Sequence, residues 1–121
     1  MGRQSMSVEW TGDKGCYHVD STDSTEKYLV DILELRGADL RCNGQCSCTD
    51  FRTRCHPEWN KSGIIVERDK PGYTRCKHIA AVIMCIGNRI FDTNPMMQDI
   101  PRTDSAVYAA GNQYCDRMSI Q

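Results

Sequence analysis

The segment Cys46-Ser47-Cys48, followed 27 residues later by Cys76-Lys77-His78, decides how this chain is interpreted. Together the two segments offer three thiols and one imidazole, which make a complete tetrahedral ligand set for zinc. On a β-strand, residues i and i+2 point to the same face, so Cys46 and Cys48 can reach one ion from a strand. The sequence therefore predicts a zinc site that joins two distant parts of the chain.

The second ligand pair requires a different backbone, because residues i and i+2 of a helix point about 200° apart. We therefore expect Cys76 and His78 to lie where a helix begins. Thr74 is the predicted N-cap, and an apolar run follows from residue 79 to residue 86. A helix N-terminus also favours a thiolate electrostatically. The prediction is a helix over residues 75–86 that stops at Gly87.

The combination of Cys-x-Cys with Cys-x-His resembles the SWIM-type zinc finger family. The resemblance extends to residues 28–32 before the first pair, to Asp50-Phe51 after it, and to residues 75–79 around the second pair. It covers residues 16–90, and the gap of 27 residues leaves room for an insertion. The resemblance implies a small zinc-stapled interaction module for DNA or for protein partners.

The composition indicates one small domain with a thin apolar core. The chain has 121 residues, 7% aromatic residues and a mean hydropathy of −0.55. In such domains a structural zinc contributes on the order of 10 kcal/mol to folding. We predict an α+β fold in which a small antiparallel β-sheet packs on a C-terminal helix. Residues 1–9 are expected to be frayed, residues 10–91 to form the zinc-binding domain, and residues 92–121 to form a linker and a short helix.

Several elements are predicted from local patterns. Residues 16–20 have the pattern of a short strand, and Asn43-Gly44 is typical of a tight turn. Residues 26–35 fit both a helical period and a strand alternation; the family resemblance implies a strand, which we adopt. Residues 50–54 are expected to form one helical turn, and residues 64–66 a short strand or a flap. Thr103 is expected to cap a last helix, one side of which carries Val107, Tyr108, Tyr114 and Met118.

Eight cysteines also permit a secreted disulfide scaffold. Residues 1–10 contain no apolar segment typical of a signal peptide. No run approaches the ~18 apolar residues of a membrane span. We therefore expect an intracellular protein, cytoplasmic or, in a eukaryote, nuclear, without a membrane partner.

Other cysteines and histidines compete as zinc ligands. Cys42 forms Cys-x-x-x-Cys with Cys46, and a second zinc site can be drawn from Cys16, His18, Cys55 and His56. The adjacent Cys55 and His56 cannot easily face one ion. The prediction is therefore one structural zinc, with the other residues left as alternatives; Cys85 is expected in the core and Cys115 half-buried. The predicted ligands are Cys46, Cys48, Cys76 and His78.

The sequence does not predict an enzyme or a small-molecule substrate. Four protein ligands close the coordination sphere, whereas a catalytic zinc keeps an open position. Cys55-His56 does not suit a nucleophile and its base, because neighbouring side chains rarely form the required hydrogen bond. The sequence contains no Gly-rich phosphate-binding loop.

Charge is distributed unevenly along a chain whose net charge is −1. Residues 49–77 carry seven basic and four acidic side chains, whereas residues 1–48 carry five basic and eight acidic ones. Trp59 and Tyr73 are candidates for stacking on unpaired bases. Two alternatives remain: an adaptor that docks a larger nucleic-acid-processing enzyme through the acidic sheet or the last helix, and a thiol redox switch that releases zinc. The leading prediction is DNA or RNA binding through Arg52, Arg54, Lys61, Arg75 and Lys77.

Overall fold

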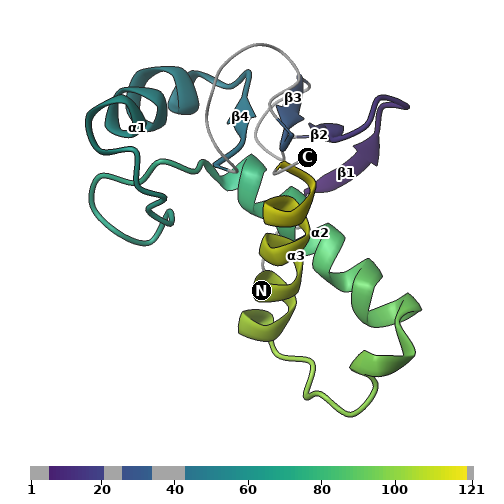
Figure 1. The fold of residues 1–121 in the computed structure, drawn as a ribbon. Helices are drawn as coiled ribbons and strands as arrows, with labels where there is room; N and C mark the ends of the chain where they lie inside the picture. Colours follow the sequence, from purple (N-terminus) through teal and green to yellow (C-terminus); the bar gives the residue numbers. More distant parts are fainter. Residues whose placement is uncertain (1–5, 21–25, 34–42, 120–121) are drawn as a thin grey trace, which may run out of the picture.

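The computed structural model describes residues 6–20, 26–33 and 43–119. They form an antiparallel sheet, three α-helices and two short helical segments (Figure 1), so the predicted α+β class is confirmed. Cys42 lies outside the described residues. The elements are β1 (Ser7–Trp10), β2 (Cys16–Asp20), β3 (Lys27–Asp31), β4 (Gln45–Cys46), the π-helical η1 (Phe51–Cys55), α1 (His56–Ser62), α2 (Lys77–Thr93), the 3₁₀ segment η2 (Pro95–Met97) and α3 (Asp104–Ser119).

The four strands follow one another in the sheet in chain order, each antiparallel to the next. The predicted strand over residues 16–20 is confirmed, and β3 shows that the strand interpretation of the ambiguous segment was right. Strand pairing outweighs the helical period there because β3 has a neighbour on each side. Val30 of β3 lies opposite Tyr17 of β2 on one side and opposite Cys46 of β4 on the other.

Strand β1 lies partly within residues 1–9, which we expected to be frayed. Its four residues pair with β2, in a register that runs from Ser7 opposite Asp20 to Trp10 opposite Tyr17. The turn between the two strands is closed by a backbone hydrogen bond from Thr11 N to Cys16 O at 3.1 Å. The expectation was therefore wrong for residues 7–9, where strand pairing satisfies backbone groups that a frayed segment leaves to water.

Helix α2 begins two residues later than predicted and continues beyond Gly87 to Thr93. The predicted stop is wrong because Gly87 serves a different purpose: it lets α3 approach. A Cβ at Gly87 would lie 1.9 Å from the carbonyl oxygen of Val107, and a Cβ at Gly111 would lie 2.1 Å from that of Ile83. The two helices therefore cross with their backbones almost in contact, as Figure 1 shows.

The main core lies between the sheet and α2, and a smaller cluster joins the end of α2 to α3. Val107 is buried and Tyr108 half-buried, as the predicted apolar side of α3 requires, whereas Tyr114 is 38% exposed. Thr103 accepts a hydrogen bond from Ala106 N at 3.1 Å, which confirms it as the cap. The side chain of Met118 lies outside the described residues. The main core includes Val19, Val30 and Ile32 from the sheet and the residue that follows it, and Ile79, Val82, Ile83 and Ile86 from α2.

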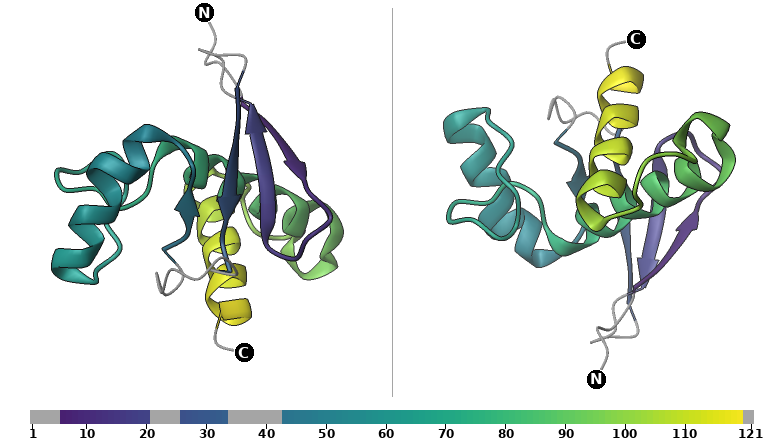
Figure 2. Two further views of the ribbon diagram at one scale, coloured as in Figure 1. Left: turned by 90° about the horizontal axis from the view of Figure 1, so that it is seen from above. Right: turned by 90° about the horizontal axis from the view of Figure 1, so that it is seen from below.

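The segment between the ligand pairs forms an arm, which we define as residues 49–73. Both views of Figure 2 show its helical part standing apart from the α2/α3 pair. The predicted helical turn over residues 50–54 is confirmed and continues into α1. Residues 64–66 form no strand; instead the amide of Val66 donates to Thr74 Oγ1 at 2.9 Å. None of the helices among the described residues has both the length and the hydropathy of a membrane-spanning segment.

The crossing of α2 and α3 yields a stability prediction. We expect Gly111→Ala to lower the free energy of unfolding by about 1–3 kcal/mol, the usual cost of overpacking, because the added methyl group meets the backbone of α2. Chemical denaturation measures the change. Ala109→Ser, at an exposed position of the same helix, is the control and should change it little. Equal stability of the two variants would show that the helices do not cross this closely.

Candidate metal centre

Four side chains from two distant segments meet at one buried point. The ligand atoms of Cys46, Cys48, Cys76 and His78 all lie within 4.8 Å of one another, and all four residues are buried. Nδ1 of His78 lies 3.7 Å from the sulfur of Cys46 and 3.9 Å from that of Cys76, so it is the imidazole nitrogen that faces the thiols. The structure thus brings together the four residues singled out from the sequence, in an arrangement that could hold one metal ion.

We had expected the first pair to lie on one strand, but only Cys46 does. Strand β4 ends at Cys46, and the hydroxyl of Ser47 accepts a hydrogen bond from Leu29 N at 2.9 Å in place of a backbone carbonyl. The chain then turns into a helix, with Arg52 N donating to Cys48 O at 3.3 Å. The sulfur of Cys48 accepts a hydrogen bond from the amide of Phe51 at 3.3 Å. Cys48 is therefore the first residue of a helix N-terminus, which stabilises a thiolate.

The second pair occupies the start of α2, where the sequence placed it. Cys76 is the N-cap, with extended backbone angles, and its carbonyl accepts the first helical hydrogen bond from Ala80 N at 3.1 Å. His78 lies in the first turn, with its ring 4.6 Å from the ring of Tyr28. The donors of the site therefore include the first residues of two helices, whose partial positive charges favour anionic ligands.

Thr74, the predicted N-cap, has a different role. Its hydroxyl donates to Asn43 Oδ1 at 2.7 Å, and Asn43 Nδ2 donates to Thr74 O at 2.8 Å. Both residues are fully buried. This reciprocal pair holds the chain just before Cys46 against the chain just before Cys76, and so brings the two ligand pairs together through protein contacts alone.

Arg75 was predicted to contact nucleic acid, and that prediction is wrong, because its side chain is 0% exposed. Its Nε donates to Asn43 O at 3.0 Å. Its Nη1 donates to Glu67 Oε2 at 3.1 Å and to Tyr108 OH at 3.2 Å. Burial raises the pKa of Tyr108, so its hydroxyl stays protonated and donates to Glu67. Arg75 thus links the arm and α3 to Asn43, in the segment that precedes Cys46.

The pKa values of the three thiols depend on one another. Hydrogen bonding to Cys46 lowers the pKa of Cys48 well below its usual range, and the same interaction, together with burial, raises the pKa of Cys46 to about 12. Hydrogen bonding to Cys46 and burial also raise the pKa of Cys76. Without a cation, ionisation of one thiol therefore opposes ionisation of the other two. A bound metal ion replaces the thiol protons, so acidification opposes binding.

The other candidate ligands do not gather. Within the described part of the chain, the four residues above are the only cluster of three or more potential ligands. Cys55 is buried in the hydrophobic core outside the cluster, and burial raises the pKa of its thiol to about 12. The ring of His56 stacks on Phe51 at 6.0 Å, and Cys16 and His18 lie on β2. Cys115 is fully buried, not half-buried as expected, and Cys85 is half-buried rather than in the core.

Neither a protein-family model, nor a characterised protein, nor a solved structure matches this chain. The class of protein is therefore inferred from the donor atoms of the site alone. Three cysteine sulfurs and one histidine nitrogen, supplied by a strand end and by helix N-termini, are consistent with a zinc finger.

A metal-content prediction follows from the shared burial of the ligands. Cys76→Ser removes a thiolate ligand, so we expect metal to fall from one ion per chain to almost none, with loss of the folded circular-dichroism spectrum. Elemental analysis of protein purified without added metal provides the first measurement. Cys85→Ser is the matched control, since Cys85 lies outside the cluster. A Cys76→Ser protein that keeps its metal and its fold would contradict the assignment.

The burial of Arg75 leads to a second prediction, which distinguishes a structural role of this side chain from a role of its charge at the surface. Arg75→Lys keeps the charge but cannot reproduce the hydrogen bonds of a guanidinium to both Asn43 and Glu67. We expect it to lower the free energy of unfolding by about 1–3 kcal/mol, the cost of leaving a buried hydrogen-bonding group without its partner. Thermal unfolding measures this, with exposed Arg54→Lys as control. Unchanged stability would contradict the structural role of Arg75 and leave it as a candidate for surface contacts with nucleic acid.

Proposed function

We propose that the metal is zinc, that it is structural, and that this domain is an interaction module that binds DNA or RNA. The observation that carries the first two statements is the burial of all four ligands, of which the most exposed, Cys46, is only 6% exposed. A catalytic zinc needs a position open to substrate. Here four protein donors complete the tetrahedral set, and the resemblance to SWIM-type fingers supports the same role.

The nucleic-acid proposal rests on the arm. Arg75 and Glu67 neutralise each other in the interior, which leaves residues 49–77 with six basic and three acidic side chains. Arg54 and Lys61 lie 3.7 Å and 3.4 Å from Asp50 and Glu58, but their side chains are 71% and 72% exposed. Such exposed pairs are weak, so both cations stay available to phosphate. Arg52 is also exposed, and no described residue forms an ion pair with it.

Base stacking does not support the proposal at this site. Trp59 is only 7% exposed and belongs to the core, so the prediction that it stacks on bases is wrong. Tyr73 is half-buried; its hydroxyl donates to Asp50 at 2.9 Å, and Arg68 lies 5.8 Å from its ring centre. Lys77 is half-buried at the base of α2. Binding through the arm is therefore expected to use phosphate contacts and to depend little on sequence.

Charge reversal on the arm tests this function. We expect Arg52→Glu/Arg54→Glu to weaken binding of a fluorescent oligonucleotide at least about tenfold, and to reduce the slope of log K against log salt by roughly 2, because two phosphate contacts are lost. Fluorescence anisotropy at several salt concentrations measures both. Lys27→Glu/Arg117→Glu makes the same charge change on exposed positions of β3 and α3 and is the control. Equal weakening by both pairs, or binding insensitive to salt, would contradict the proposal.

A second candidate, the protein adaptor, is favoured by a groove of about 880 Å³ between β1 and α2. Its floor includes Met6, Val8 and Met84, and three cations border it: Arg68, Lys77 and Arg89. The last helix, which we had considered for this role, already packs Val107 and Ala110 against α2. A stoichiometric protein partner that is lost with Met84→Glu, in a protein that binds no oligonucleotide, would favour this candidate.

A further inference from the structure

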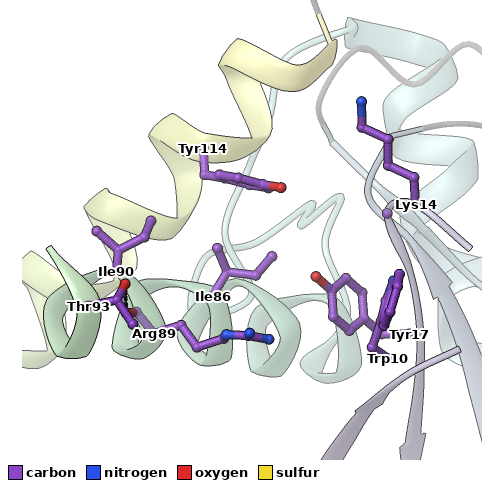
Figure 3. Close-up of a pocket in the computed structure, with 9 residues that line it drawn as sticks. Trp10, Lys14, Tyr17, Ile86, Arg89, Ile90, Thr93 and Tyr114 are labelled. Carbon is purple, nitrogen blue, oxygen red and sulfur yellow. Dashed lines mark hydrogen bonds between the residues drawn. The ribbon is translucent and has the colours of Figure 1, made fainter. Parts of the chain in front are cut away.

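A cavity of about 420 Å³ lies between the β1/β2 end of the sheet, the C-terminal half of α2 and α3 (Figure 3). Its nearest residue on α2 to the metal centre, Ile86, is eight positions beyond His78, or about 12 Å along the helix axis. The cavity is therefore separate from the metal centre. Its size falls within the ~300–1,000 Å³ of small-molecule sites.

Three aromatic side chains line this cavity: Trp10, Tyr17 and Tyr114. Figure 3 shows the hydroxyl groups of Tyr17 and Tyr114 directed into the cavity from the sheet and from α3, with Trp10 beside Tyr17. Trp10 and Tyr17 are cross-strand partners. The indole N–H of Trp10 donates to Asp13 O at 2.9 Å, which fixes the ring although 58% of the residue is exposed. The aromatic wall is thus in place before any ligand arrives.

The charge of the lining is entirely positive. Lys14 and Arg89 contribute two cations, and the lining contains no carboxylate within the described part of the chain. No described residue forms an ion pair with either cation. The acid one helical turn beyond Arg89 on the same face, Asp92, is engaged by Arg102 at 2.8 Å. Burial raises the pKa of Tyr17, so its hydroxyl remains protonated and can donate a hydrogen bond.

We propose that this cavity binds a nucleotide, with the base on the aromatic wall of Trp10 and Tyr17 and the phosphate on Arg89. A flat ring suits stacking on aromatic side chains, and an anion suits the guanidinium of Arg89. The same chemistry is found in a free nucleoside monophosphate and in an unpaired nucleotide of a single strand. The inference does not rest on the basic arm, which contributes no residue to the cavity.

The test is a titration of the full chain with adenosine 5′-monophosphate, followed through the NMR signal of the Trp10 indole N–H. We expect saturable shifts, and binding at least about tenfold tighter than that of adenosine or of inorganic phosphate alone, because each supplies only half of the contacts. Trp10→Ala and Arg89→Gln should each weaken binding about tenfold; for Trp10→Ala, binding is followed by calorimetry. Competition by a short single-stranded oligonucleotide identifies the strand as the source, and its absence identifies the free nucleotide.

Thermal unfolding of each variant shows whether it is folded. If Trp10→Ala does not fold, Arg89→Gln alone tests the cavity. Arg54→Gln is the matched control and should bind the nucleotide normally. The inference is overturned if the nucleotide gives no saturable shift, or if binding survives both cavity variants. Loss of nucleotide binding in Arg52→Glu/Arg54→Glu alone would also overturn it, while supporting the arm. Conversely, loss of oligonucleotide binding in the arm variant with nucleotide binding intact would support both sites as independent.

Discussion

Everything in this domain depends on bringing two ligand pairs, separated by 27 residues, to within 4.8 Å of each other. Strand β4, which carries Cys46, has only two residues paired with β3. Such short contacts cannot alone offset the entropy of closing the arm. The Asn43/Thr74 pair supplies hydrogen bonds across the gap. A cation held by all four ligands would close it completely.

The electrostatics of the site indicate what a bound cation would contribute. Three buried sulfurs at this separation cannot all ionise, because each negative charge opposes the next. The amide of Phe51 and the start of α2 offset part of that repulsion. A divalent ion at this point would offset the remainder, because its charge exceeds what hydrogen bonds supply. Zinc with three thiolates and one imidazole still carries a charge of about −1, which the two helix N-termini can stabilise.

The sequence predicted well which four side chains gather at one point, because metal binding requires particular side chains at particular spacings. It also predicted the strand over residues 16–20 and the Thr103 cap, which depend on local pattern. It failed where the role of a residue is set by distant partners. Thr74 has the right residue type and place for a cap, yet its hydroxyl bonds to Asn43, 31 residues away. Nothing local distinguishes these possibilities.

The same limit accounts for Arg75, Trp59 and Gly87. A basic residue beside a ligand looks like a surface contact until Glu67 and Tyr108 are known to surround it. An aromatic residue in a polar loop looks available for stacking until the loop folds back on the core. A glycine at the end of an apolar run looks like a helix stop until α3 requires close approach. In each case packing between segments far apart in sequence overrides a correct local rule.

Helix α2 connects the features of the molecule that bear on function. Its first turn carries Cys76 and His78, its middle packs on the sheet through Val82 and Ile83, and its C-terminal half forms one wall of the cavity. The opposite wall belongs to β1 and β2, so the cavity exists only while sheet and helix are held together. A metal ion at one end of α2 would therefore stabilise the walls of the proposed nucleotide site at the other end without touching the nucleotide. The arm leaves the body between the two ligand pairs, and its basic residues gain a fixed position from the same closure.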